Sequence, residues 1–136
     1  MSHLAFTHNP NGKLFLEIFT CVQIHDPSVF FLDAEFEIIY KGVSFGHAKV
    51  VAIRQLQFRM ISDVLAYLEH GKPAALYAKQ LATTMGEHGK LEPDQCLDHI
   101  ALQYTSLNLK EVAIEMREWW EERNRDVAPV LIGIEI

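Results

Sequence analysis

The chain has no apolar run long enough to cross a membrane. Its longest apolar stretches, residues 29–32 and 128–134, fall far short of the roughly 20 residues that span a bilayer. The N-terminal residues lack the basic region, apolar core and small-residue cleavage site of a secretory signal. We therefore expect a cytoplasmic protein without a membrane partner.

Cysteine is scarce, and the patterns that bind metals are missing. The two cysteines, Cys21 and Cys96, are far apart and form no disulfide framework, so both thiols should be reduced. Zinc usually requires three or four ligands, and neither a CxxC pair nor an HExxH motif occurs. The sequence predicts neither a metal site nor a cofactor.

Motifs of catalysis and phosphate binding are also absent. There is no GxSxG nucleophile elbow, and the GxGxxG and P-loop patterns do not occur. Cys21 lies in a predicted strand with no cue for a lowered pKa. We assign no catalytic residue, and a binding protein is favoured over an enzyme.

Basic residues are few relative to acidic residues toward the C-terminus. The formal net charge of the chain is −6, and residues 87–136 contain 11 Asp and Glu against 5 Lys and Arg. Such a field opposes binding to nucleic acid and favours a basic protein partner. Solubility is the simpler explanation of an acidic surface.

The first third of the chain alternates apolar and polar residues with the period of β-strands. Strands are predicted at residues 13–24, 34–40 and 43–53, with Lys41 and Gly42 as a short turn between the last two. These strands predict an antiparallel meander.

From about residue 55 the apolar period changes to that of α-helices. Helices are predicted at residues 56–71, 73–86 and 93–106, followed by one that begins after Asn108 with Glu111 at the capping-box position. The first should be deeply buried. Residues 130–136 are apolar and β-branched and predict a final strand.

Strands and helices are thus segregated along the chain. We predict one α+β domain over residues 1–136, with an antiparallel sheet formed by the N-terminal three-strand meander and the C-terminal strand. About four helices should cover one face of this sheet.

The last helix combines a tryptophan pair with many charges. On a helical wheel its apolar residues form one stripe that should face the core: Leu109, Ala113, Met116, Trp120 and Val127. Trp119 should lie at the edge of this stripe, with its indole N–H in water. Four glutamates, which we name the acidic ridge, should face away from the core: Glu111, Glu115, Glu118 and Glu122.

The acidic ridge suggests a surface for a protein partner. Like charges on one helix face repel, and mixed charges would meet solubility at less cost. The predicted partner-binding residues are Glu111, Glu115, Glu118, Glu122, Trp119, Glu92, Asp94 and Asp98. The sharpest hypothesis is an immunity-type inhibitor that neutralises a basic effector, such as a nuclease toxin.

Two alternatives stay open. The first is a small enzyme or ligand-binding protein with a pocket between sheet and helices that uses His47 with His99 or Cys96. Cys96 and His99 share a face of a predicted helix, but the sequence leaves open whether the three residues converge. The second is an adaptor or chaperone that forms a homo-oligomer through a strand edge.

The tetrapeptide EHGK occurs twice, at residues 69–72 and 87–90. It is best explained as a sequence that ends one helix before the next begins.

Overall fold

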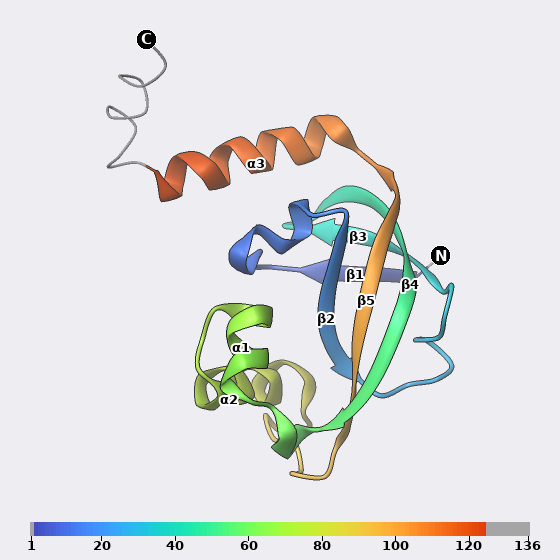
Figure 1. The fold of residues 1–136 in the computed structure, drawn as a ribbon, viewed down its shortest axis with the longest axis vertical. Helices are drawn as coiled ribbons and strands as arrows, with labels where there is room; N and C mark the ends of the chain where they lie inside the picture. Colours follow the sequence, from blue (N-terminus) through green and yellow to red (C-terminus); the bar gives the residue numbers. More distant parts are fainter. Residues whose placement is uncertain (1, 125–136) are drawn as a thin grey trace.

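The computed structural model describes residues 2–124 and shows an α+β fold with a curled five-stranded sheet (Figure 1). In chain order its elements are β1 (Ser2–Phe6), the 3-10 helix η1 (Pro10–Phe15), β2 (Ile18–Ile24), β3 (Glu35–Tyr40), β4 (Val43–Gln57), the 3-10 helix η2 (Phe58–Met60), α1 (Asp63–His70), α2 (Ala74–Met85), β5 (Cys96–Leu107) and α3 (Leu109–Arg123). The short helices α1 and α2 lie at one end of the sheet, and α3 crosses the other end (Figure 1).

The sheet is mixed, with strand order β1-β3-β4-β5-β2. β1 runs parallel to β3, and every other neighbouring pair is antiparallel. Register shifts interrupt the long β4–β5 ladder twice, and such irregularities bend a sheet. Gly46 lies in this ladder at φ +125°, where an added Cβ would lie 2.1 Å from the Ser106 carbonyl oxygen, so the two strands approach closely only because this residue is glycine.

The predicted antiparallel meander is correct for one of its two connections. β3 and β4 form a hairpin, and its two-residue turn places Lys41 and Gly42 at positive φ, as a type I′ turn requires. β2, however, pairs with β5 rather than with β3, because the loop after β2 carries the chain past the two strands between them. The parallel strand β1 was not predicted, so the expectation of a purely antiparallel sheet is wrong.

The predicted helix over residues 93–106 is also wrong, since this segment forms β5. Ile100, Leu102 and Tyr104 alternate along the strand and are buried. The residues between them, Ala101 and Gln103, are half-buried, so the segment does have the alternation of a strand. The three α-helices within residues 2–124 are therefore one fewer than the predicted four or so.

The predicted helix over residues 56–71 divides into two elements. β4 continues to Gln57, and α1 begins only after Ser62, whose hydroxyl accepts a hydrogen bond from the Leu65 amide at 3.2 Å. The expectation of deep burial is wrong, because Val64 in α1 is 70% exposed. The helix over residues 73–86 is confirmed by α2.

The core consists of two clusters inside the curl of the sheet. The larger cluster contains residues of all five strands and one residue of α3, Val112. The smaller one joins the helices α1 and α2 to the sheet through the side chains of Val22, Leu56, Leu65, Ala66, Tyr77, Leu81 and Leu97. Helices thus pack at both ends of the sheet, with four core residues from α1 and α2 at one end and Val112 of α3 at the other.

Two predictions lie outside the described residues: the final strand over residues 130–136 and the place of Val127 in the apolar stripe. Within residues 2–124, none of the helices has both the length and the apolar character that crossing a bilayer requires.

Candidate functional site

Trp119 is the residue that seats α3 on the body of the protein. Its ring packs edge-on against Phe15 of η1, with 5.8 Å between the ring centroids. Gly12, at φ +66°, leaves the space for this ring, since an added Cβ would lie 3.1 Å from the Trp119 Cζ2 atom. The Arg123 guanidinium lies on the ring, 4.0 Å from its centroid. The prediction that the Trp119 N–H lies in water is wrong, because Nε1 is buried.

The apolar stripe of α3 faces solvent rather than the core. Leu109 is 71% exposed and Trp120 44%, and Ala113 and Met116 between them are exposed as well. The prediction that this stripe packs on the sheet is therefore wrong. A wheel groups apolar residues correctly, but the helix rotates to whichever side chain finds a matching cavity, and here that side chain is Trp119 above Gly12.

The acidic ridge and the apolar stripe lie on opposite flanks of this seat. At about 100° per residue, each is roughly 80° away from the line through Val112 and Trp119. Glu111 and Glu115 are half-buried, whereas Glu118 and Glu122 are exposed. The ridge borders Lys41, whose pKa is raised first by Tyr40 and then by Glu115 and Glu118.

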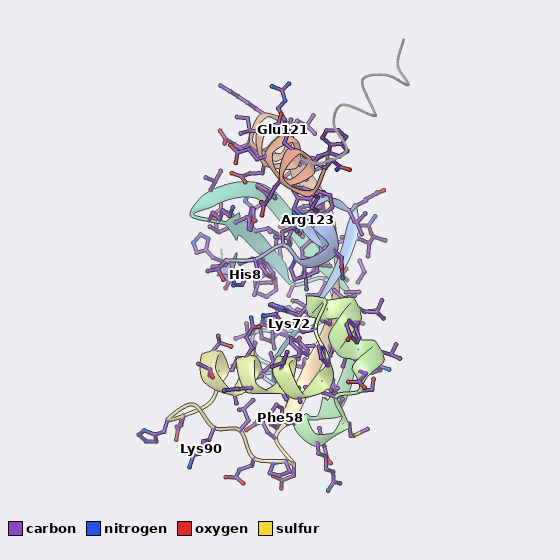
Figure 2. All side chains as sticks on the ribbon, turned by 90° about the vertical axis from the view of Figure 1, so that its left-hand side faces the viewer. His8, Phe58, Lys72, Lys90, Glu121 and Arg123 are labelled. Atoms are coloured by element: carbon purple, nitrogen blue, oxygen red, sulfur yellow. The ribbon has the colours of Figure 1, made fainter. Side chains whose placement is uncertain are left out.

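The other predicted partner-binding acids do not join the ridge. Glu92 and Asp94 are exposed in the loop after α2, at the end of the molecule opposite α3, as the positions of Lys90 and Glu121 show (Figure 2). Asp98 is only 1% exposed, and its carboxylate lies 2.9 Å from His25 Nδ1. The predicted residues thus form no continuous surface, although their role in partner binding stays a prediction.

A buried ionic network around Glu69 was missed by the sequence analysis. Glu69 is 1% exposed and accepts hydrogen bonds from Lys13 Nζ at 3.0 Å, His99 Nε2 at 2.6 Å and the Thr20 hydroxyl. Burial alone would raise the pKa of this carboxyl, but the hydrogen bond from His99, the charge of Lys13 and the hydrogen bond from Thr20 lower it to about 2. The network therefore fastens α1 to η1, β2 and β5 through one ionised carboxylate.

The hydrogen-bond donor and acceptor on either side of His99 determine its tautomer. Arg54 Nη2 lies 3.2 Å from His99 Nδ1, and a guanidinium can only donate, so Nδ1 accepts. The imidazole proton is then on Nε2 and is donated to Glu69. A neutral His99 leaves Lys13 as the direct counter-charge of Glu69.

The EHGK motif at residues 69–72 does more than end a helix. Gly71 does end α1 in the left-handed conformation, as predicted. Glu69 and His70 also point inward, and no sequence signal marks this, because a buried glutamate is recognised only by partners distant in the chain. In the second copy, residues 87–90, Glu87 and Lys90 pair across a tight turn between α2 and β5.

His47, His99 and Cys96 do not converge. In the β4–β5 ladder His47 pairs with Ser106 and Arg54 with His99, so the two histidines lie roughly 20 Å apart at about 3.3 Å per residue. Cys96 and His99 are three apart in a strand, so they point to opposite faces. Among residues 2–124, no His, Cys, Asp or Glu side chains cluster in a way that could hold a metal ion.

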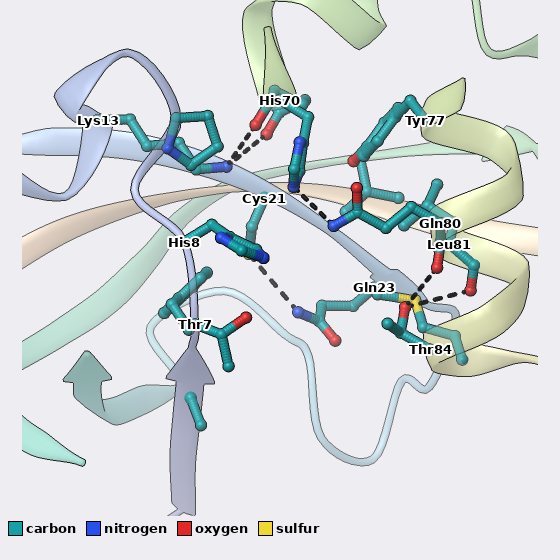
Figure 3. Close-up of a pocket in the computed structure, with 16 residues that line it drawn as sticks. Thr7, His8, Lys13, Cys21, Gln23, His70, Tyr77, Gln80, Leu81 and Thr84 are labelled. Carbon is teal, nitrogen blue, oxygen red and sulfur yellow. Dashed lines mark hydrogen bonds and ion pairs between the residues drawn. The ribbon is translucent and has the colours of Figure 1, made fainter. Parts of the chain in front are cut away.

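A cavity of about 340 Å³ does lie between the sheet and the helices, but other residues line it. Figure 3 shows His70 and Gln80 joined by a hydrogen bond at this cavity, with the His8 ring facing them. Cys21 also lines it, and burial raises the pKa of its thiol to about 12. The thiol is therefore protonated near neutral pH and is a poor nucleophile.

Comparison with protein-family models, curated proteins and solved structures found no match to this chain.

Proposed function

We propose that this chain is a non-enzymatic binding protein that contacts a basic protein partner through α3. The observation that carries the proposal is the exposed apolar face formed by Leu109, Ala113, Met116 and Trp120, named here the α3 stripe. Exposed apolar side chains are common singly, but a contiguous face on one helix is typical of an interaction surface.

The α3 stripe has the spacing of a helix that packs against another surface. Its residues follow each other at intervals of four, three and four, which keeps them on one side of the helix. Beside it is a shallow hollow of about 360 Å³ lined by Ala113, Met116, Arg117 and Trp120. A large apolar side chain of a partner fits such a hollow, and tryptophan is the residue type most enriched among interface hot spots.

The negative charge of this chain indicates that its partner is basic. The net charge of −6 and the exposed Glu118 and Glu122 on the neighbouring flank attract a basic surface from a distance. The stripe and the ridge then have separate roles: the stripe slows dissociation, and the ridge speeds association. In its most specific form the partner is a basic effector in the cytoplasm, such as a nuclease toxin, and this chain is its inhibitor.

The interior of the protein is better suited to stability than to catalysis. Glu69 is held ionised by three donors, so it serves poorly as a general acid. The nearby Cys21 thiol has a raised pKa and no histidine within hydrogen-bond reach among residues 2–124. These observations favour the binding protein over the enzyme.

Site-specific photo-crosslinking in the native host identifies the partner. A photoreactive amino acid in place of Met116 should capture one discrete protein, and the same group in place of Lys90, at the opposite end of the molecule, should not. The captured protein is then purified and its binding measured directly, since capture alone does not support the proposal.

Binding of the two purified proteins decides the question. Trp120→Ser should weaken affinity by roughly tenfold or more through faster dissociation. Replacing Glu111, Glu115, Glu118 and Glu122 by Gln should slow association and reduce its dependence on salt. An acidic partner, unchanged kinetics in both variants, or capture of a second copy of this chain alone would each contradict the proposal.

A further inference from the structure

A second hollow lies between α3 and the body of the protein, on the side away from the α3 stripe. It encloses about 330 Å³, and its lining includes Tyr40, Lys41, Lys72, Trp119, Glu122 and Arg123. We name it the α3 cleft. Figure 2 shows Arg123, His8 and Lys72 along one side of the molecule, between α3 and α1.

Cations dominate the wall of the α3 cleft, although the whole chain is acidic. Lys41, Lys72 and Arg123 face a single carboxylate in the wall, Glu122. Within residues 2–124, the ion pairs of the protein involve none of these three cations. Lys72 Nζ donates to the neutral Gln80 Oε1 at 3.2 Å, and Arg123 stacks on Trp119.

Nearby acids weaken this positive field. Glu115 and Glu118 lie close enough to Lys41 to raise its pKa, whereas Glu69 is compensated by Lys13. Lys72 and Arg123 form no ion pair with a carboxylate among residues 2–124, so they contribute most of the positive charge of the cleft.

Two buried hydrogen-bond donors of residues that line the cleft, Asn9 Nδ2 and Trp119 Nε1, have no partner among residues 2–124. A buried donor without an acceptor is costly, and a water, an ion or a ligand often supplies the missing partner. The ring of His70 also borders the cleft: Lys72 fixes Gln80 with its amide NH₂ toward His70 Nε2, which therefore accepts, so the imidazole proton is on Nδ1.

Positive charges surround the His70 ring. Burial lowers the pKa of its imidazole, and the nearby charges of Lys72, His8 and Lys13 lower it further, whereas a hydrogen bond to its own backbone acts in the opposite direction. An anion bound in the cleft would offset the positive potential at this ring.

We propose that the α3 cleft binds a small phosphate monoester, with its phosphate group between Lys41, Lys72 and Arg123. The wall of the cleft holds three cations and one carboxylate, and a phosphate monoester carries a charge of about −1.5 to −2 at pH 7. Glu122 would accept a hydrogen bond from a ligand hydroxyl, and the rings of Tyr40 and Trp119 provide an apolar wall.

The two tryptophans supply a direct test by nuclear magnetic resonance. The full chain is titrated with inorganic phosphate and with ribose 5-phosphate at constant ionic strength, and both indole N–H signals are followed. The Trp119 signal should move in a saturable way, and the exposed Trp120 signal should stay in place as the internal control. Ribose 5-phosphate should bind more tightly than inorganic phosphate because its hydroxyl groups reach Glu122.

Charge-removing variants establish where the anion binds. Lys72→Gln and Arg123→Gln should each weaken phosphate binding by roughly tenfold, the usual effect of losing a charge-assisted hydrogen bond. Lys79→Gln, which removes an exposed lysine of α2 outside the cleft, should leave it unchanged. Sodium chloride that moves the Trp119 signal as phosphate does, a Trp119 signal that does not respond, or equal binding by the three variants would overturn the proposal. Trp120→Ser should not affect this binding, so the result is independent of the proposed protein partner.

Discussion

The helices α1 and α3 both lie against η1, yet they are held in opposite ways. α1 has 8 residues and is fastened by a buried carboxylate whose three donors come from three other elements. α3 has 15 residues and is fastened by Val112 and one tryptophan ring. The comparison shows that the length of a helix does not determine how firmly it is attached. α1 belongs to the core, whereas α3 is free to offer one of its flanks to a partner.

The largest expected effect is on the attachment of α1. Glu69→Ala removes the carboxylate and leaves Lys13 buried without its counter-charge, so the free energy of unfolding should fall by about 3–5 kcal/mol. Chemical denaturation measures this change. Glu92→Ala, which removes an exposed carboxylate from the loop before β5, is the matched control and should change stability by less than about 0.5 kcal/mol. Equal losses in the two variants would show that the network does not hold α1.

The same carboxylate should make stability depend on pH. Its pKa is about 2 in the folded protein against an ordinary value of 4.5, so the unfolded chain takes up the proton first. The stabilisation, about 3 kcal/mol, is complete above pH 5 and is lost as the pH falls toward 2. Denaturation of wild type and Glu69→Gln at several pH values isolates this term, because their difference should shrink over that range. A difference independent of pH contradicts the assignment.

The next effect is on the attachment of α3. Trp119→Ala should lower the free energy of unfolding by about 2 kcal/mol, less than for a fully buried tryptophan, because the ring is only half-buried. Trp120→Ala should change it by about 0.5 kcal/mol or less, because that ring faces solvent. The sequence pattern predicts the reverse order, and thermal or chemical unfolding of the two variants distinguishes the two.

A smaller effect than that of Trp119→Ala is expected at the residue beneath this ring. Gly12→Ala places a Cβ against the ring and forces alanine to φ +66°, which should cost about 1–2 kcal/mol. The cost should be smaller in a Trp119→Ala background, where the ring is gone. Additive losses in the double variant would mean that Gly12 acts only through its backbone conformation.

Local patterns in the sequence were sufficient for the elements whose partners are near in the chain. The hairpin at Lys41 and Gly42, the helix α2 and the cap at Gly71 each depend on a few neighbouring residues, and each is found as predicted. β5 was not found, although its buried residues alternate as in a strand. The reason is that several of its apolar residues also have the i, i+3, i+4, i+7 spacing of a helix face: Leu97, Ile100, Ala101 and Tyr104.

Features that depend on distant residues could not be predicted. Glu69 and His99 meet only through the curl of the sheet, and the sequence between them shows no sign of it. The rotation of α3 depends on a cavity beside Gly12, a hundred residues earlier, so the wheel named the right stripe but assigned it to the wrong side. The role of the acidic ridge in binding is still a prediction.

The seating of α3 determines which tryptophan is exposed, and the chain contains two tryptophans in all. Trp119→Phe leaves Trp120 as the single tryptophan fluorophore, and Trp120→Phe leaves Trp119, so quenching of fluorescence by acrylamide reports each ring separately. In the isolated protein we expect strong quenching of Trp120 and weak quenching of Trp119, and the partner should protect Trp120. A shielded Trp120 together with an accessible Trp119 would contradict the seating of α3 and, with it, the proposed binding surface.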